Sequence, residues 1–355
     1  MYADICILCD MAYRAAVVGG SGYTGAELLR LLAGHPEIEV GSVTADSNAG
    51  AKVRDLYPSL AAAYPDLTYE LVATNDLAGF DVVFLGLPHG ESQRLVPELV
   101  DTVGHLVDLG ADFRLPLDAY HEWYGGEHAA PDLLGRFAYG LPELYRDEIV
   151  VARHVASPGC YPTTASLALA PLLAAGLVEH AGIVVDAASG VSGAGRGLKA
   201  TSLFAEVDEN VVPYGLLTHR HTGEMELALT HVAGAPVQVL FTPHLVPMTR
   251  GILATCYARP AVDGLSTDQL LGLYREFYAG EQFVVVTDEP PVTKATMGSN
   301  AAHVSVRYDD RTNTVLALGA LDNLVKGASG QALQCANLVL GLPETAGLSA
   351  IGLMP

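Results

Sequence analysis

The fold of this chain is decided by the run YRAAVVGGSGYTGAELLRLLA, residues 13–33. Residues 13–18 predict a buried strand, residues 26–33 predict a helix, and glycines recur at every third position between them. Such a turn lets the backbone approach a pyrophosphate at the helix N-terminus, although glycine turns also close units that bind nothing. The run therefore predicts a dinucleotide site, with these candidate ligands: Gly19, Ser21, Gly22, Tyr23, Thr24 and Gly25.

The next predicted strand, residues 37–44, ends beside an acid that bears on the choice of dinucleotide. Asp46 lies 21 residues after Gly25. An acid at about this distance normally binds the adenosine ribose and favours NAD over NADP. Ser47 and Asn48 could instead hydrogen-bond a 2′-phosphate, so the residues alone leave the coenzyme open between NAD and NADP.

Two further apolar runs, residues 81–85 and 105–109, predict buried parallel strands. Ligands of an open α/β sheet bind at the carboxyl ends of its strands. We therefore expect Pro88 to line the cofactor and Arg114 to anchor an anion, although a surface pairing of Arg114 with Asp112 or Asp118 fits its spacing equally well. Residues 116–148 predict a loop-rich connection.

The heptapeptide SPGCYPT, residues 157–163, sets a cysteine between a predicted strand, residues 149–156, and a predicted helix, residues 163–175, that ends at Gly176. Cys160 is thus expected at a helix N-terminus. Unpaired backbone N–H groups and the positive end of the helix dipole there favour the nucleophilic thiolate. A buried structural cysteine is the alternative.

The second half of the chain predicts strands with few helices between them, at residues 182–186, 237–241, 251–255, 283–286, 303–307 and 315–318. Residues 309–313 predict a hairpin, and residues 323–340 predict a helix that packs back onto the first domain. We expect an α/β protein with a Rossmann-type dinucleotide-binding domain, residues 13–156 with 325–355. An α+β domain with a mixed, largely antiparallel sheet spans 157–324, and residues 1–12 lie outside the fold.

Three clusters in the second domain predict ligand contacts. The glycine-rich loop 189–197 suits close approach of a ligand at Ser189, Gly190 and Gly193, and Arg196 at its end could bind an anion, although a flexible loop has the same composition. Asn323 could hydrogen-bond a nicotinamide amide. Arg250 and Lys326 could hold carboxylate or phosphate, with surface roles as the alternative.

The run His219-Arg220-His221 supplies groups that exchange protons near neutral pH, which a nucleophilic cysteine requires. In an extended segment the two histidines would share a face. Zinc binding by Cys160 with both histidines is disfavoured, because no fourth ligand has a suitable spacing. We expect no metal.

Composition limits the partners. Of 355 residues, 50% are hydrophobic and 17% are charged. The sequence contains no uninterrupted apolar run of about 18 residues, so it predicts no membrane span. The net charge of −21 argues against nucleic acid or an anionic membrane as a partner. The five scattered cysteines fit a reducing cytoplasm. We discount the Cys6/Cys9 pair, since Met11 could be the true start.

Taken together, the motifs at residues 19–25, 87–90, 110–114, 158–163, 189–196, 219–221 and 322–327 resemble the N-acetyl-gamma-glutamyl-phosphate reductase family of arginine biosynthesis, within the aspartate-semialdehyde dehydrogenase superfamily. The resemblance runs from about Tyr13 to the C-terminus. It implies a cytoplasmic, NADP-dependent acyl-phosphate reductase that assembles as a homotetramer or homodimer. Two residues depart from the family pattern: Ser157 replaces the usual asparagine, and Asp46 is unexpected for NADP.

The resemblance also assigns roles. Cys160 is the nucleophile, His219 the acid/base, His221 and Tyr161 lie near the substrate, and Arg114 holds the phosphate. The implied reaction is attack of the thiolate on an acyl phosphate, release of phosphate, and reduction of the resulting thioester by hydride. The alternatives are a sister enzyme acting on aspartyl phosphate or on a carrier-linked aminoadipyl phosphate, and a non-catalytic dinucleotide sensor.

Overall fold

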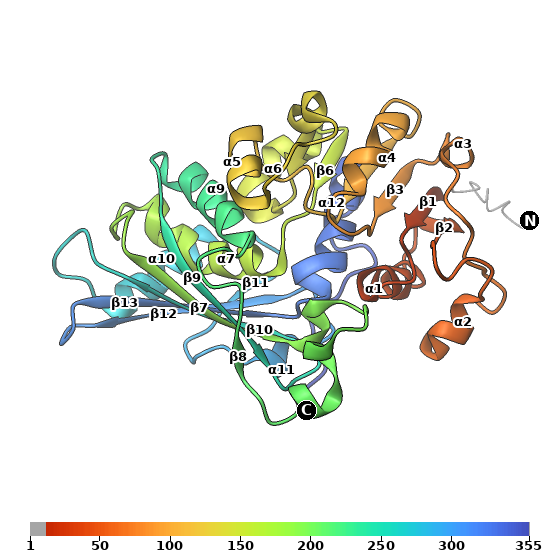
Figure 1. The fold of residues 1–355 in the computed structure, drawn as a ribbon. Coiled ribbons are helices and arrows are strands. Elements are labelled where there is room, and N and C mark those ends of the chain that lie inside the picture. Colours follow the sequence, from red (N-terminus) through yellow and green to blue (C-terminus); the bar gives the residue numbers. More distant parts are fainter. Residues whose placement is uncertain (1–11, 355) are drawn as a thin grey trace, which may run out of the picture.

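The first domain is built on a parallel sheet of six strands in the order β2-β1-β3-β4-β6-β5 (Figure 1). This computed structural model describes residues 12–354, so Cys6 and Cys9 lie outside the described residues. The strands predicted at 13–18, 37–44, 81–85 and 105–109 are confirmed. Their bounds are β1 Tyr13–Val18, β2 Ile38–Val43, β3 Val82–Leu85, β4 His105–Asp108, β5 Phe137–Tyr139 and β6 His154–Ala156.

The helices of this domain correct two expectations. They are α1 Tyr23–Leu32, α2 Val53–Leu56, α3 Thr74–Leu77, α4 Ser92–Leu99, α5 Leu117–Tyr124 and α6 Pro142–Val151. Residues 116–148 are therefore not loop-rich, and residues 149–151 belong to a helix instead of a strand. Tyr145 and Ile149 bury one helical face of α6, whereas Val150 and Val151 are exposed. Their β-branched side chains resemble a strand, but the buried residues follow helical spacing.

The second domain holds a mixed sheet of seven strands in the order β11-β12-β13-β10-β7-β9-β8. Only the pairs β11/β12 and β7/β9 are parallel, so the predicted mixed, largely antiparallel sheet is confirmed, as is the β12/β13 hairpin. The strands are β7 Ile183–Gly190, β8 Val212–Pro213, β9 Val239–Val246, β10 Ile252–Ala258, β11 Val284–Val286, β12 Ala302–Asp309 and β13 Thr314–Leu321.

Helices cover one face of this sheet, and they are more extensive than expected. The helices of the domain are α7 Cys160–Ala174, α8 Phe204–Val207, α9 His221–Ala233, α10 Thr267–Phe277 and α11 Thr293–Thr296, and it is α7 with its neighbours α9 and α10 that packs on the sheet. Residues 161–173 of α7 are buried on every side, because α7 lies between the sheet and its neighbours α9 and α10. A helix that is apolar all round is a buried one. The core of the domain therefore forms around the helix that begins at Cys160.

The C-terminal helices return to the first domain. A π-helix, Val325–Ser329, leads into α12 Gly330–Val339, which packs Ala332, Leu333 and Ala336 into the core beside β1. The helix predicted at 323–340 and its return to the first domain are thus confirmed. Within the described residues, no helix is long and apolar enough to cross a membrane.

Candidate active site

Cys160 is the first residue of α7, as the sequence predicts. The turn before it follows β6, and Ser157 N–H donates to Asp108 O at the end of β4 (2.8 Å), so the turn is tied to the carboxyl edge of the first sheet. A Cβ added to Gly327 would lie 2.7 Å from Cys160 Cβ, and the π-helix therefore packs directly on the cysteine. The thiol lies where the two domains meet.

The position of Cys160 at a helix N-terminus does not lower the pKa of its thiol below the ordinary value. Burial raises the pKa of Cys160 from 9.0 to about 11, outweighing the stabilising effects of the Tyr161 backbone N–H and the Arg114 charge. The nearby Glu224 carboxylate raises it further. The helix terminus thus favours the thiolate, as expected, but burial has the larger effect and the net shift of the Cys160 pKa is upward.

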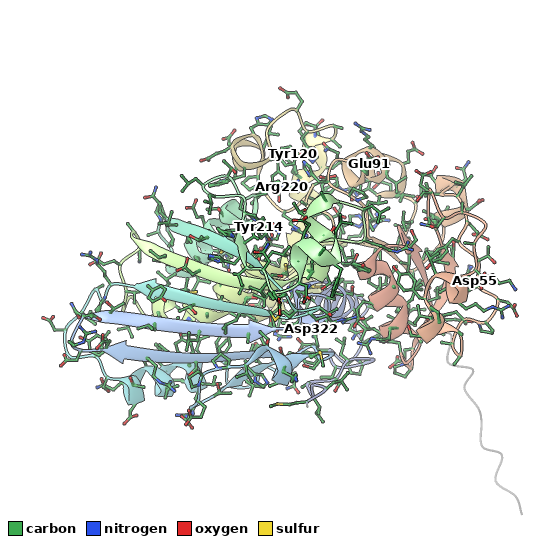
Figure 2. The ribbon with its side chains drawn as sticks, turned by 60° about the horizontal axis from the view of Figure 1, so that its bottom comes forward. Asp55, Glu91, Tyr120, Tyr214, Arg220 and Asp322 are labelled. Carbon is green, nitrogen blue, oxygen red and sulfur yellow. The ribbon has the colours of Figure 1, made fainter. Side chains whose placement is uncertain are left out.

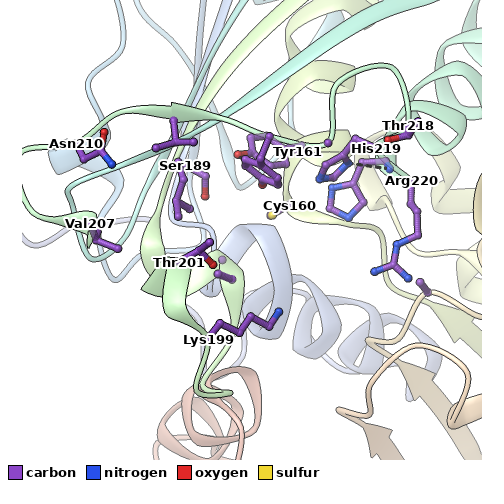
Figure 3. Close-up of a pocket in the computed structure, with 18 of the residues that line it drawn as sticks. Cys160, Tyr161, Ser189, Lys199, Thr201, Val207, Asn210, Thr218, His219 and Arg220 are labelled. Carbon is purple, nitrogen blue, oxygen red and sulfur yellow. Dashed lines mark hydrogen bonds between the residues drawn. The ribbon is translucent and has the colours of Figure 1, made fainter. Parts of the chain in front are cut away.

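Cys160 opens into a cavity of about 660 Å³ that also contains both predicted histidines (Figure 3). Ser189, Tyr161 and His219 line it beside the thiol. Two cations, Lys199 and Arg220, reach this cavity from different segments. In the part of the chain that the structure describes, neither cation has a carboxylate within 4 Å. With these two cations against the one carboxylate of Glu206 on its lining, the cavity offers positive charge to an anionic ligand.

The two histidines lie in a turn and at a helix start, not in the extended segment expected. Their ring centroids are 4.8 Å apart, and His221 N–H donates to His219 Nδ1 (3.2 Å). Burial, with the Arg220 charge, lowers the pKa of His219 to about 4, and burial lowers the pKa of His221 well below its usual value. Both rings are therefore neutral at pH 7. Because Nδ1 of His219 accepts a hydrogen bond, its proton is on Nε2.

A buried carboxylate, Glu224, connects the elements of the site. Its Oε1 accepts from Arg114 Nη1 (2.9 Å) and its Oε2 from Gly159 N–H (2.9 Å), and it lies 3.8 Å from His221 Nε2. Tyr124 also approaches it, at 3.4 Å. One carboxylate thus holds Arg114 and the cysteine turn by hydrogen bonds and lies close to His221. The sequence interpretation gave Glu224 no role, although its place one turn after His221 was visible.

Arg114 is buried, so both surface pairings considered for it, with Asp112 or Asp118, are wrong. It borders a second cavity of about 260 Å³ together with Cys160 and His221. Burial would lower its pKa, but the Glu224 charge outweighs burial and raises it. Arg114 is thus a permanent cation next to the thiol, partly neutralised by Glu224.

Tyr161 forms a wall of the larger cavity. Its hydroxyl donates to His244 O (3.2 Å) and accepts from Tyr214 (3.1 Å), and its ring packs edge-on to both histidines. Gly159 packs closely on the histidine-bearing segment, because a Cβ at this residue would lie 2.4 Å from His221 Nε2. These contacts fix the imidazoles, and the role of Tyr161 as a substrate ligand stays a prediction.

The glycine turn has the geometry that a dinucleotide requires. Gly19 has φ +77°, and a Cβ there would lie 2.5 Å from Gly86 O, while a Cβ on Gly25 would lie 2.5 Å from Gly20 Cα. Gly22 caps α1, which begins three residues before the predicted helix and carries no acid in its first turn. The free N–H groups and the close backbone approach fit a pyrophosphate.

The other predicted cofactor residues lie in different surroundings. Ser189 and Gly193 line the larger cavity, and Asn323 borders the smaller one, although its amide already bonds Gly251 N–H (2.7 Å) and Ser192 Oγ (2.9 Å). Gly190 lines neither cavity. It packs against the backbone of the segment before β10 instead, because a Cβ there would lie 2.8 Å from Arg250 N. Pro88 is exposed just after β3 and also lines neither.

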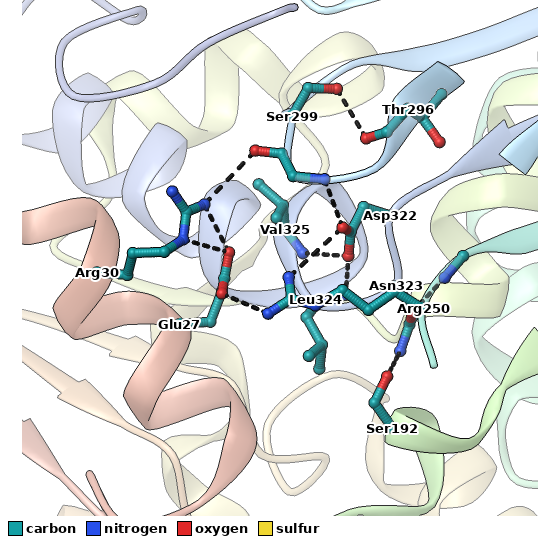
Figure 4. A network of polar contacts seen from close by, with 12 residues as sticks. Glu27, Arg30, Ser192, Arg250, Thr296, Ser299, Asp322, Asn323, Leu324 and Val325 are labelled. Carbon is teal, nitrogen blue, oxygen red and sulfur yellow. Dashed lines mark hydrogen bonds and ion pairs between the residues drawn. The ribbon is translucent and has the colours of Figure 1, made fainter. Parts of the chain in front are cut away.

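Arg250 and Lys326 are internal partners, so their predicted role as anion ligands is wrong. Arg250 bonds Glu27 of α1 (2.7 Å) and lies 3.5 Å from Asp322 (Figure 4). Lys326 is fully buried against Glu143 (2.6 Å). Arg250 therefore joins the two domains, whereas Lys326 ties the π-helix to α6 within the first domain, and neither is free for a ligand.

Residues 14–152 match the family described as semialdehyde dehydrogenase, NAD binding domain, and residues 160–323 match semialdehyde dehydrogenase, dimerisation domain. Within residues 12–354, no group of three or more histidine, cysteine, aspartate or glutamate side chains is arranged to hold a metal ion. The two family matches meet at the turn that carries Cys160.

Relatives match over nearly the whole chain. N-acetyl-gamma-glutamyl-phosphate reductase from Symbiobacterium thermophilum is 52% identical over 346 residues, covering 96% of this chain and 99% of that protein. The proteins of the same name from Desulforamulus reducens and Pseudomonas paraeruginosa are each 46% identical over 345 residues, with the same coverage.

Solved structures share the fold at low identity. Aspartate semialdehyde dehydrogenase II from Vibrio cholerae superposes with a TM-score of 0.71 at 16% identity, covering 93% of this chain and 98% of that one. The Candida albicans aspartate semialdehyde dehydrogenase with NADP superposes with a TM-score of 0.67 at 19% identity, covering 93% and 99%. These likenesses support the two-domain architecture alone.

Proposed function

This chain belongs to the N-acetyl-gamma-glutamyl-phosphate reductase family, and we propose that it reduces N-acetyl-L-glutamyl 5-phosphate with NADPH to N-acetyl-L-glutamate 5-semialdehyde and phosphate, in arginine biosynthesis. The relatives supply the substrate and the reaction class. The observation that carries the proposal in this chain is the position of Cys160, at the start of α7 in a cavity with two neutral histidines and unpaired cations.

The first step forms a thioester on Cys160. The thiol gives its proton to His221, which here takes the base role that the resemblance assigns to His219, because its buried Nδ1 has no hydrogen-bond partner among the described residues. The thiolate then attacks the acyl-phosphate carbonyl, backbone N–H groups at the start of α7 stabilise the oxyanion, and phosphate leaves as the C–O bond breaks. Arg114, next to the thiol, supplies positive charge to that phosphate.

The second step reduces the thioester. NADPH, when bound at the glycine turn, supplies the hydride to the carbonyl carbon. His219 donates its Nε2 proton as a hydrogen bond to the alkoxide that develops, a role which fits its neutral tautomer. The C–S bond then breaks to release the aldehyde, and the departing thiolate takes back the proton that His221 received, which restores the neutral thiol.

The remaining substrate charge is an α-carboxylate, and Arg220 is suited to hold it. Its guanidinium lies over the Tyr124 ring at 5.3 Å, at the edge of the larger cavity, and it has no carboxylate partner in the described chain. A bidentate carboxylate contact is a strong use of such a guanidinium. The sequence interpretation passed over Arg220 between its two histidines.

The protein is further proposed to act in the cytoplasm as a homodimer or homotetramer. Support for assembly comes from the second sheet, whose helices cover one face only (Figure 2). Apolar residues Leu240 and Tyr257 are exposed on the other face. A second copy of the chain is the partner that would cover it.

The test is phosphate-dependent oxidation of N-acetylglutamate semialdehyde, followed at 340 nm with NADP and NAD in parallel and aspartate semialdehyde as the control substrate. We expect activity with the acetylated aldehyde, none with Cys160→Ser, and unchanged coenzyme binding in that variant. Turnover of the control substrate alone would reassign the enzyme to aspartyl phosphate.

The same assay tests Arg220. We expect Arg220→Met to raise KM for the acetylated aldehyde about tenfold or more, since a charged hydrogen bond contributes about 1.5–3 kcal/mol. The KM for the coenzyme should not change. An unchanged substrate KM would show that another group holds the carboxylate.

A further inference from the structure

Arg196 belongs to the glycine-rich loop of the second domain, and its side chain reaches the dinucleotide turn of the first. Its Nη1 donates to Ser21 O (3.4 Å), and its guanidinium lies over the Tyr57 ring, 5.6 Å from the centroid. Tyr57 OH donates to the same Ser21 carbonyl (2.8 Å). The sequence predicted Arg196 as a substrate ligand, but these contacts place it at the cofactor end of the site.

A polar cluster stands beside this guanidinium, just after β2. Asn48 Nδ2 donates to Ser21 Oγ (3.1 Å) and lies 3.4 Å from Ser47 Oγ. These side chains follow the second strand of the parallel sheet, which is where this fold binds the adenosine ribose and where an arginine accommodates a 2′-phosphate. The cluster and Arg196 therefore meet where the two coenzymes differ.

The other cations near this edge are already engaged. Lys52 bonds Asp66 (2.9 Å), Arg54 lies within 4.0 Å of Asp55 and Asp66, and Arg30 bonds Glu27. Among residues 12–354, Arg196 has no carboxylate within 4 Å, and its side chain is exposed. It is thus the free cation at this edge of the sheet.

We infer that Arg196, supplied by the second domain, binds the 2′-phosphate of NADP(H) together with Ser47 and Asn48. This inference rests on the proposed use of NADP and explains how the site takes that coenzyme despite Asp46. The guanidinium offsets the repulsion between the Asp46 carboxylate and the phosphate, and it offers paired donors that fit phosphate oxygens. Selection of the coenzyme then depends on both domains.

The test compares binding of 2′,5′-ADP and 5′-AMP by calorimetry, since the two ligands differ only in the 2′-phosphate. We expect Arg196→Met to raise the dissociation constant of 2′,5′-ADP at least tenfold and to leave that of 5′-AMP within twofold. Arg196→Lys should recover part of the loss, because it restores the charge without the paired donors. KM for NADPH should rise with kcat unchanged.

Arg311→Met is the matched control, because it also removes one arginine. The Arg311 side chain is 83% exposed at the β12/β13 hairpin, away from the glycine turn of the first domain. It should bind both nucleotides as the wild type does. Equal weakening of 5′-AMP and 2′,5′-ADP binding in Arg196→Met, or no weakening of either, would overturn the inference. Nucleotide binding needs no turnover, so a failure of the proposed reductase activity would leave this result readable.

Discussion

At the scale of single residues, the proposed chemistry depends on the thiol of Cys160, whose raised pKa keeps it protonated at neutral pH. The α7 N-terminus and Arg114 favour the thiolate, but burial in the site has the larger effect on the pKa of Cys160. The thiol and the two histidines are neutral, so they add no negative charge to the cavity and do not repel an anionic ligand. Nucleophilicity is then generated by proton transfer during the reaction.

This balance predicts the pH dependence of alkylation. Because the pKa of Cys160 is raised to about 11, the thiolate fraction at pH 8 is about 100-fold below that of a thiol with the ordinary value of 9.0. The rate of iodoacetamide labelling of the free enzyme, followed by mass spectrometry, should rise about tenfold per pH unit from 7 to 10. Buried Cys256 and Cys335 should stay unlabelled in the folded protein.

A labelling rate that levels off below pH 9 would show that the helix terminus outweighs burial after all. Labelling of the urea-unfolded chain provides the control, since all cysteines then titrate near their ordinary value. Equal labelling rates at Cys160 and Cys256 in the folded protein would remove the case for an accessible nucleophile.

The surroundings of a residue can be predicted from the sequence where they depend on its neighbours in the chain, but not where they depend on partners far away in the sequence. The place of Cys160 at a helix start follows from its neighbours in the chain. The pairing of Arg114 with Glu224 joins residues 110 positions apart, and that of Lys326 with Glu143 joins residues 183 apart. No local spacing reveals either pair, and so Glu224 was missed and Lys326 was misassigned as a ligand.

At the scale of elements, the strand predictions succeeded because buried parallel strands are continuous apolar runs. The strand predicted at residues 149–151 is wrong, because β-branched residues on an exposed face of α6 resemble a continuous apolar run. The loop-rich connection predicted at residues 116–148 is also wrong. Helices α5 and α6 are separated there by irregular segments, and each is too short to show a clear helical spacing of apolar residues. The missed helix α5 carries Tyr124, which contacts both Glu224 and Arg220.

The π-helix leads to a second prediction, since it packs on Cys160 through Gly327. A Cβ at this residue would lie 2.7 Å from Cys160 Cβ, so Gly327→Ala must displace the thiol or the π-helix. We expect kcat to fall at least tenfold and the free energy of unfolding to fall by about 1–3 kcal/mol. Binding of ADP should be retained. Urea unfolding and the 340 nm assay measure these effects.

Gly272→Ala is the control, because Gly272 lies within α10 and a Cβ there would meet no heavy atom within 4 Å. It should leave kcat unchanged and stabilise the protein by about 0.5–1 kcal/mol, as alanine does in a helix. Normal kcat in Gly327→Ala would mean that the cysteine tolerates movement of the π-helix.

At the scale of the whole molecule, the two domains share one site and are joined by buried charge. Glu27 of α1 bonds Arg250, which approaches Asp322, and Asp322 Oδ2 accepts from Gly298 N–H (2.7 Å) (Figure 4). Breaking such a pair by removing one partner leaves an uncompensated buried charge. The position of the glycine turn relative to Cys160 is therefore fixed by these contacts as well as by packing.

The whole molecule also bears on the proposed assembly, because in the described residues helices α7, α9 and α10 pack on one face of the second sheet and leave the other open. The strand register places Leu240, Val184, Tyr257 and Leu316 side by side across β9, β7, β10 and β13 on the open face. Leu240 is 50% exposed and Tyr257 37% exposed in the single chain. A row of apolar side chains across four strands is typical of a face that another protein covers.

Substitution of Tyr257 by aspartate tests that assembly. In a two-fold interface the new carboxylate enters twice, and burying an unpaired charge should weaken association by at least about 100-fold. Light scattering after gel filtration should give the mass of at least two chains for the wild type and a smaller mass for Tyr257→Asp. Val151→Asp, at an apolar residue of α6 that is 82% exposed in the first domain, should keep the wild-type mass. If Tyr257→Asp also keeps that mass, the copies meet elsewhere, and the open sheet face must then be explained by a different partner.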